Sequence, residues 1–146
     1  MNKNNQYNRY TNNPDNDFYY QMKRQINDVD VMRNIELDLL IDFADKFAEK
    51  FLKNVKTHQI RRFFSSVKSI EKKVRSSDSV LSDSERVKLI MLRPQLANAS
   101  AKQKQLKKLT EICTIMIQKV DEKPDFERFA NFFESLVAFH KVYAKE

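Results

Sequence analysis

The sequence predicts an all-α fold, a single-domain bundle of about five helices, and three observations support this prediction. Glycine is absent from the 146 residues and proline occurs three times, so the tight turns of β-hairpins are difficult to form. Residue types that favour helices, such as Lys, Leu, Glu and Ala, are plentiful after the N-terminal segment. Apolar residues recur at spacings of three and four in several stretches, which is the pattern of amphipathic helices.

The N-terminal segment differs in composition from the rest of the chain. Residues 1–17 are rich in asparagine and contain no aliphatic residue after Met1, so we expect a disordered tail. Residues 18–33 fit either an ordered arm or a short helix. The helical bundle domain is therefore expected over residues 34–146.

Two helices are expected in the first half of this domain. The first should run from Asn34, a plausible N-cap, to Asn54. The second should begin after Thr57, another candidate cap, and it has the most regular apolar stripe of the chain. That stripe consists of Ile60, Phe63, Phe64, Val67, Ile70 and Val74.

A third helix is expected to begin near Asp83. Ser82, just before this helix, and Glu85, in its first turn, have the spacing of a capping box. In a capping box, each of the two side chains binds the backbone amide of the other residue. The apolar residues expected to face the core are Val87, Ile90 and Met91.

Pro94 interrupts this third helix in the sequence. It lacks an amide hydrogen and disfavours helical geometry at Arg93, so the helix should be broken or kinked there. One interpretation is a helix boundary with an exposed arginine. The other is that the break turns Arg93 outward and opens a new segment whose free amides can face phosphate.

A fourth helix is expected from about Ala101 to Val120, and a fifth from Pro124, in its first turn, to about Ala144. The fifth helix carries two apolar stripes, offset by about 60 to 100°. Either it is a central helix packed on two sides within the monomer, or part of it meets another subunit. The buried face expected for the fourth helix is Leu106, Leu109, Cys113, Met116 and Val120; the residues expected at a subunit interface are Phe132, Leu136, Phe139 and Tyr143.

Positive charge is concentrated in two places. The formal net charge is +7, which indicates a polyanionic partner, nucleic acid rather than an anionic membrane surface. Residues 56–77 hold seven basic residues and one acid, and a lysine cluster begins at Lys102. Such runs are often only a solvated helix face, but like charges on two separate helices favour contacts with phosphates, which carry no base readout. The candidate contacts are Arg61, Arg62, Lys68, Lys72, Arg75, Arg93, Lys102, Lys104, Lys107 and Lys108.

The sequence offers little for catalysis, metal binding or membrane insertion. Cys113, the single cysteine, has apolar neighbours at helical spacing and is expected to be a buried, inert thiol. His140 is expected to be a hydrogen-bonded histidine of the core or of an interface, whereas His58 could meet a phosphate or remain in solvent. We expect no enzyme activity, cofactor, metal or small-molecule substrate. No run approaches the roughly 20 apolar residues of a membrane span, and no signal peptide is visible, so we expect a cytoplasmic protein.

Three segments resemble the small subunit of the type III-A CRISPR effector, the Csm complex. They are THQIRRFFSSV (57–67), MLRPQLANASAK (91–102) and DFERFANFFESLVAFHK (125–141). The last is the most specific, because it is similar to the family's phenylalanine-rich helix that ends in an aromatic residue, His and Lys. The family tends to carry an aromatic residue where this chain has Asn98, and a tyrosine where it has Phe139.

The resemblance implies an all-helical, non-catalytic subunit. Copies of it would stack head to tail along the guide and target RNA, beside larger subunits of the complex, and its basic surface would hold the RNA backbone. We therefore expect an RNA-binding structural subunit of a CRISPR ribonucleoprotein in antiviral defence. The alternatives are the equivalent small subunit of a type III-B complex, a helical adaptor or dimerising regulator that binds acidic proteins, and, last, an enzyme that uses His58 or His140.

Overall fold

Helix α7 (Lys123–Tyr143) is the centre of the fold. In the computed structural model, which describes residues 13–75 and 79–145, it packs against α3 (Leu37–Phe51), α4 (Thr57–Arg75) and the 3-10 helix η1 (Met32–Asn34). Pro124 lies in its first turn, as predicted. Both apolar stripes of α7 contribute to the core, which explains why it is apolar on more than one side. Its buried apolar residues are Phe126, Phe129, Ala130, Phe132, Phe133, Leu136 and Val137.

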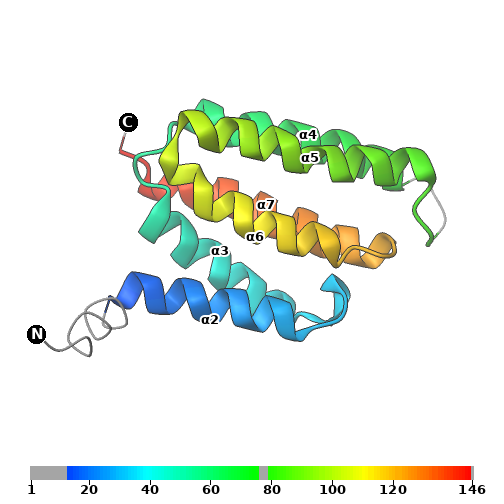
Figure 1. The fold of residues 1–146 in the computed structure, drawn as a ribbon, viewed down its shortest axis with the longest axis horizontal. Helices are drawn as coiled ribbons and strands as arrows, with labels where there is room; N and C mark the ends of the chain where they lie inside the picture. Colours follow the sequence, from blue (N-terminus) through cyan, green and yellow to red (C-terminus); the bar gives the residue numbers. More distant parts are fainter. Residues whose placement is uncertain (1–12, 76–78, 146) are drawn as a thin grey trace, which may run out of the picture.

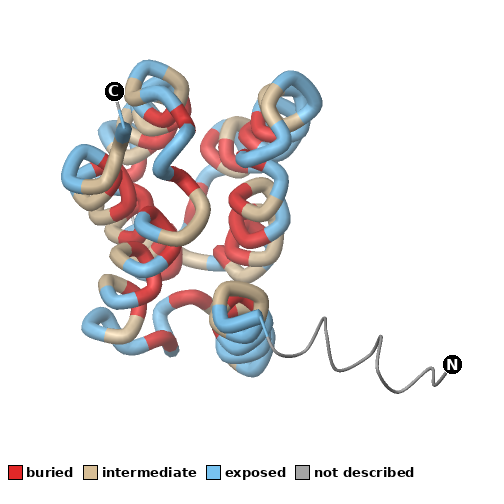
Figure 2. The backbone as a smooth tube through the Cα atoms, turned by 90° about the vertical axis from the view of Figure 1, so that its left-hand side faces the viewer, coloured by how far each residue is buried: buried red, intermediate tan, exposed pale blue. Residues whose placement is uncertain are grey.

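The helices form two layers of three (Figure 1). One layer contains α3, α7 and α4, and the other contains α2 (Pro14–Asp28), α6 (Lys107–Gln118) and α5 (Asp83–Lys102). Contacts of α4 with α5 and of α2 with α3 join the layers. Figure 2 shows that the buried residues lie on the sides of the helices that face each other. The predicted all-α bundle is confirmed, with six α-helices in the described ranges instead of about five.

The first described helix, α2, extends into the segment predicted to be a disordered tail. It begins at Pro14, and the Asn13 side chain caps it by accepting a hydrogen bond from the Asp15 amide at 3.0 Å. The prediction of disorder is therefore wrong for residues 14–17, and residues 1–12 lie outside the described ranges. Tyr19, Met22 and Ile26 are buried against α3 and α6, so the bundle includes residues that precede position 34.

The start of α3 differs from the prediction. Asn34 is the last residue of η1 and does not cap α3, whose N-cap position is occupied by Glu36 without a capping hydrogen bond from its side chain. The chain turns toward the core before α3 begins. Met32 and Ile35 are both buried, and the Ile35 amide donates a hydrogen bond to the Met32 carbonyl. The burial of these residues in the tertiary structure therefore outweighs the preference of Asn34 for an N-cap position.

Helix α4 follows the prediction closely. It begins at Thr57 and ends at Arg75. Of the predicted stripe, Phe64 is half-buried. The other members of the stripe are fully in the core: Ile60, Phe63, Val67, Ile70 and Val74.

Helix α5 begins as predicted but ends later. The Ser82 hydroxyl accepts from the Glu85 amide at 3.2 Å and the Glu85 carboxylate accepts from the Ser82 amide at 3.4 Å, which confirms the capping box. The helix is not broken at Pro94, because α5 continues through it to Lys102, and the other predicted form, a kink there, stays a prediction. Pro94 is exposed, so its ring meets solvent and displaces no packed side chain. The residues that follow Arg93 directly belong to the same helix, so no new helix start exposes free amides at this point.

The inward face of α5 is also different from the predicted one. Val87, Ile90 and Met91 are 59%, 52% and 51% exposed. On a helical wheel they lie about 180° from the residues that α5 does bury. Packing against α4 and α6 selects that opposite set, in which the apolar members are Leu89, Leu92 and Leu96.

The predicted fourth helix is divided differently. It was expected from Ala101, but α5 ends at Lys102, a short 3-10 helix, η2, spans Lys104–Leu106, and α6 begins at Lys107. Burial raises the pKa of the Cys113 thiol, so the thiol stays protonated, as expected of an inert cysteine. The predicted apolar face is confirmed as buried: Leu106, Leu109, Cys113, Met116 and Val120.

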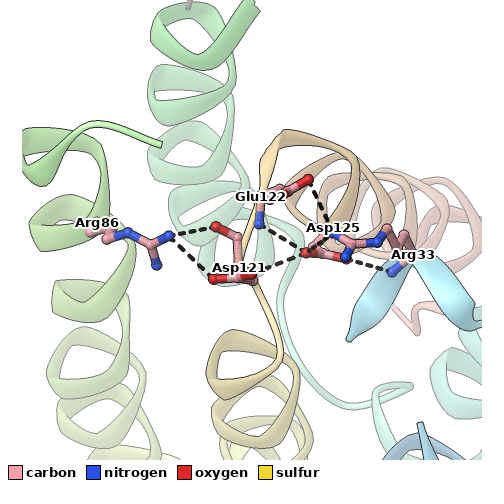
Figure 3. Close-up of polar contacts among 5 residues, drawn as sticks. All are labelled: Arg33, Arg86, Asp121, Glu122 and Asp125. Carbon is pink, nitrogen blue, oxygen red and sulfur yellow. Dashed lines mark hydrogen bonds and ion pairs between the residues drawn. The ribbon is translucent and has the colours of Figure 1, made fainter. Parts of the chain in front are cut away.

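A polar network fixes the turn between α6 and α7 (Figure 3). The buried Asp125 carboxylate accepts hydrogen bonds from the backbone amides of Asp121, Glu122 and Arg33 at 3.1, 2.9 and 2.8 Å. On the other side of the turn, the Arg86 guanidinium donates to the Asp121 carbonyl and lies 3.5 Å from its carboxylate. The network therefore connects η1, α5 and the start of α7.

Candidate nucleic-acid interface

Helix α4 presents basic side chains away from its buried stripe. Arg61, Lys72 and Arg75 are exposed, and Lys68 is half-buried. Neither Arg61 nor Lys72 has an ion-pair partner within residues 13–75 and 79–145. These two charges are therefore available to a polyanion.

Glu71 compensates the other two cations of this row. Its carboxylate lies 3.2 Å from the Lys68 ammonium and 2.9 Å from the Arg75 guanidinium. The Lys68 ammonium also lies 4.0 Å from the Glu134 carboxylate and 5.4 Å from the centre of the Phe64 ring. Lys68 is thus the least available of the four, because three neighbouring groups already stabilise its charge.

A groove of about 440 Å³ lies between α4 and α5 and carries two further predicted contacts, Arg62 and Lys102. Both side chains are exposed, and neither has an ion-pair partner in the part of the chain that the structure describes. Among the described residues, no carboxylate lines the groove. Its lining residues are Gln59, Arg62, Phe63, Ser66, Gln95, Asn98, Ala99, Lys102 and Leu106.

The chemistry of this groove suits a phosphate-sugar backbone. An arginine and a lysine can neutralise phosphate oxygens, and the side-chain amides of Gln59, Gln95 and Asn98 can donate to phosphates or exchange hydrogen bonds with ribose hydroxyls. Phe63 is buried, and Asn98 has no ring. The groove therefore offers backbone contacts and no aromatic platform for bases.

The amides of the groove were not among the predicted site residues. Gln59 and Ser66 lie three residues before and four residues after Arg62, and hence on the same face of α4. On α5, Gln95, Asn98 and Lys102 share a face in the same way. This spacing could have identified them, but a helix predicted to be broken or kinked near Pro94 gave no reason to extend a common face across these positions.

The remaining predicted cations separate into three groups. Lys104 and Lys107 are exposed. Lys108 is half-buried, with its ammonium 4.8 Å from the centre of the Tyr19 ring and 5.7 Å from that of Phe51, so it helps hold α2. Arg93 is exposed but lines a different groove, between α5 and α6.

The second stripe of α7, predicted as a subunit interface, lies largely inside the chain. Phe132 and Leu136 are completely buried, so packing within the monomer accounts for them. Phe139 and Tyr143 are half-buried, and the Tyr143 hydroxyl donates to the Asp45 carboxylate at 2.5 Å. Subunit contact stays a prediction for Phe139 and Tyr143, the two that keep some accessible surface.

The two histidines occupy different environments. His140 is buried, and its Nε2 lies 2.7 Å from the Val55 carbonyl oxygen, which confirms the expected hydrogen-bonded core histidine. The contact joins α7 to the loop between α3 and α4. His58 is exposed in the first turn of α4.

Two further findings concern the described residues alone. They include no group of three or more His, Cys, Asp or Glu side chains that could hold a metal ion. None of their helices combines the length and the apolar composition that a membrane crossing requires.

Comparison with known proteins gives one family. The model of the family described as Csm2 Type III-A matches residues 34–146. This range begins after α2, at the last residue of η1, and covers every later element. The search of curated proteins finds no match to the chain.

Proposed function

The chain belongs to the Csm2 type III-A family, and from this premise we propose that it holds guide and target RNA as a non-catalytic structural subunit in antiviral defence. Family membership makes it a small subunit of the type III-A CRISPR effector. The match is to the type III-A family, which favours this class over the type III-B alternative. Membership also implies association with the other subunits of the complex and with RNA.

The groove between α4 and α5 is the observation that supports RNA binding best. It combines Arg62 and Lys102 with three side-chain amides, and none of its described lining residues is a carboxylate. Arg61 and Lys72 add two exposed cations on another side of α4, about 80 to 100° around the helix from Arg62. We assign the first contacts to these four cations, and supporting contacts to Lys68, Arg75, Lys104 and Lys107.

Binding through such a surface has a defined physical character. Each phosphate that a cation neutralises releases condensed counterions, so affinity falls as the salt concentration rises. The amides of Gln59, Gln95 and Asn98 can add hydrogen bonds to sugar and phosphate. Because the groove has no aromatic platform, the bound RNA is expected to be held independently of its sequence.

We further propose that copies of the chain stack along the RNA. The accessible parts of Phe139 and Tyr143 on α7, together with Val142, which is 72% exposed, give this contact an apolar surface. Phe132 and Leu136 support that surface from the core side.

Ultraviolet crosslinking in the assembled effector tests the proposed RNA contact. Peptides of this chain that carry crosslinked nucleotides should come from the groove segments of α4 and α5, around Arg62 and Lys102. The exposed acidic positions of α3, such as Asp42 and Glu49, provide an internal control that should carry none. A complex that lacks RNA but retains an acidic protein would contradict the proposal and support the adaptor alternative.

A further inference from the structure

Helix α5 carries apolar side chains on two opposite faces. Leu89, Leu92 and Leu96 are 2–3% exposed and fill the core. Val87, Ile90 and Met91 on the opposite face are more than half exposed. A contiguous apolar face of this kind on a helix surface marks an interaction site, because the exposure of apolar side chains to water is unfavourable.

The exposed face forms one wall of a groove between α5 and α6. The groove has a volume of about 440 Å³ and is distinct from the basic groove on the α4 side. Its lining residues are Ile90, Met91, Arg93, Pro94, Ala97, Thr110 and Thr114.

The two threonines of the groove direct their hydroxyl groups to the backbone. The Thr110 hydroxyl lies 3.2 Å from the Leu96 carbonyl and 3.0 Å from the Leu106 carbonyl, and the Thr114 hydroxyl donates to the Thr110 carbonyl at 2.7 Å. Their hydrogen-bond donors are therefore used within the chain. The α6 wall contributes little that a polar ligand would require.

Two polar features remain in this groove. Arg93 is its one charged lining residue, and it has no ion-pair partner within residues 13–75 and 79–145. Pro94 has no amide hydrogen to donate to the Ile90 carbonyl, the acceptor one turn earlier in α5. A fitting partner would bring a carboxylate to Arg93 and could bring a donor to the Ile90 carbonyl.

These features distinguish between the possible occupants. RNA would find one cation among apolar side chains, whereas nucleic-acid interfaces are polar and rich in positive charge. A second copy packed through the same face by a two-fold axis would bring two Arg93-bearing grooves together, with no acid in either lining, and the stacking contact proposed above is assigned to the apolar surface of α7. A different protein with acidic residues beside an apolar ridge satisfies both the apolar wall and Arg93.

We propose that the groove between α5 and α6 binds an amphipathic helix of another protein subunit of the effector. The helix's apolar ridge contacts Ile90 and Met91, and a carboxylate on its flank pairs with Arg93. The exposed stripe from Val87 to Ala97 is about 15 Å long, so it accommodates roughly three turns of the bound helix. The proposal rests on membership of the effector family and does not depend on RNA binding by the α4–α5 groove.

Site-specific photocrosslinking in the assembled effector tests the proposal. A photoreactive phenylalanine analogue at position 91 should crosslink to a segment of a different subunit that has helical apolar periodicity and acidic flanks. The same analogue at Asp42 on α3 provides the control and should not reach that segment. Crosslinks that lead to a second copy of this chain or to RNA, or no crosslink at all, would overturn the proposal.

Substitutions give an independent readout through assembly. Ile90→Ser combined with Met91→Ser should lower the amount of this chain in the purified complex at least about tenfold, and Arg93→Glu should lower it whereas Arg93→Lys should not. Val80→Ser, at another exposed apolar residue, is the matched control. The salt dependence of RNA binding by the isolated variants should not change. A failure of the docking proposal is therefore distinguishable from a failure of the RNA-binding proposal. Incorporation of the Ile90 and Met91 variant at the wild-type level would contradict the docking site.

Discussion

Arg33 and Asp125 are joined by two hydrogen bonds, although they lie 92 positions apart in the chain. The Arg33 amide donates to one carboxylate oxygen of Asp125 at 2.8 Å, and its guanidinium donates to the other at 3.0 Å (Figure 3). Asp125 is completely buried, whereas the Arg33 side chain is 38% exposed. One carboxylate therefore organises the entry to α3 and the start of α7 together.

Removal of this carboxylate should destabilise the fold. Asp125→Ala leaves backbone amides and the Arg33 guanidinium without their acceptor, and we expect a loss of about 3 kcal/mol in the free energy of unfolding, measured by urea denaturation. Glu127→Ala, at an exposed carboxylate two positions later on α7, should change it by less than about 0.5 kcal/mol. Equal effects of the two substitutions would show that the network is not structural.

The capping box of α5 gives a smaller, local prediction. Ser82→Ala removes the hydroxyl that accepts from the Glu85 amide and should cost about 1 kcal/mol in thermal or urea unfolding. Ser84→Ala is the matched control, since Ser84 is exposed in the first turn of the same helix. Similar stabilities of the two variants would contradict a capping role.

Pro94 should limit the stability of α5 from within. Pro94→Ala supplies an amide hydrogen for the Ile90 carbonyl and relieves the ring's clash with the preceding turn, so unfolding should require up to about 3 kcal/mol more. The gain is reduced by the greater freedom of alanine in the unfolded chain. A variant less stable than the wild type would indicate that α5 depends on the proline.

Tyr143 should ionise at unusually high pH. Its hydrogen bond to Asp45, partial desolvation and the negative charges of Asp45 and Glu49 raise the pKa of its phenol from 10.0 to about 12. Because the folded-state pKa lies above the unfolded value, the associated stability is present below pH 10 and is lost as the pH rises to about 12. A titration of the ring carbon chemical shifts, assigned with Tyr143→Phe, measures this pKa, which Asp45→Asn should lower; a pKa near 10 in the wild type would contradict the contact.

The features that depend on a local sequence pattern could be predicted from the sequence. The apolar face of α4, the Ser82 and Glu85 cap and the start of α7 near Pro124 rest on local patterns that the tertiary structure reinforces. Local rules failed where packing chose between alternatives. Asn34 does not cap α3, because the burial of Met32 and Ile35 places it in η1. Helix α5 has two opposite apolar faces, and periodicity alone cannot identify which of them is buried.

The candidate RNA site could be predicted only in part, because it lies between two helices. The charge pattern identified Arg62 and Lys102 as candidates, but their shared groove depends on α5 remaining helical through Pro94. The same pattern could not show that Glu71 compensates Lys68 and Arg75, or that Lys108 lies over the Tyr19 ring. These are contacts of side chains whose directions follow from packing and not from spacing.

The salt dependence of RNA binding tests the central claim most directly. The logarithm of the binding constant for single-stranded RNA should be measured against the logarithm of the salt concentration for the wild type and for Arg62→Glu with Lys102→Glu. Lys46→Glu with Lys53→Glu, at two exposed lysines of α3 and the loop that follows it, makes the same change in net charge. We predict that the groove variant loses affinity and that its slope is shallower by about 0.7 per lost phosphate contact, while the control keeps the wild-type slope. Equal slopes for the wild type and the groove variant, with the fold intact, would contradict RNA binding through the groove between α4 and α5.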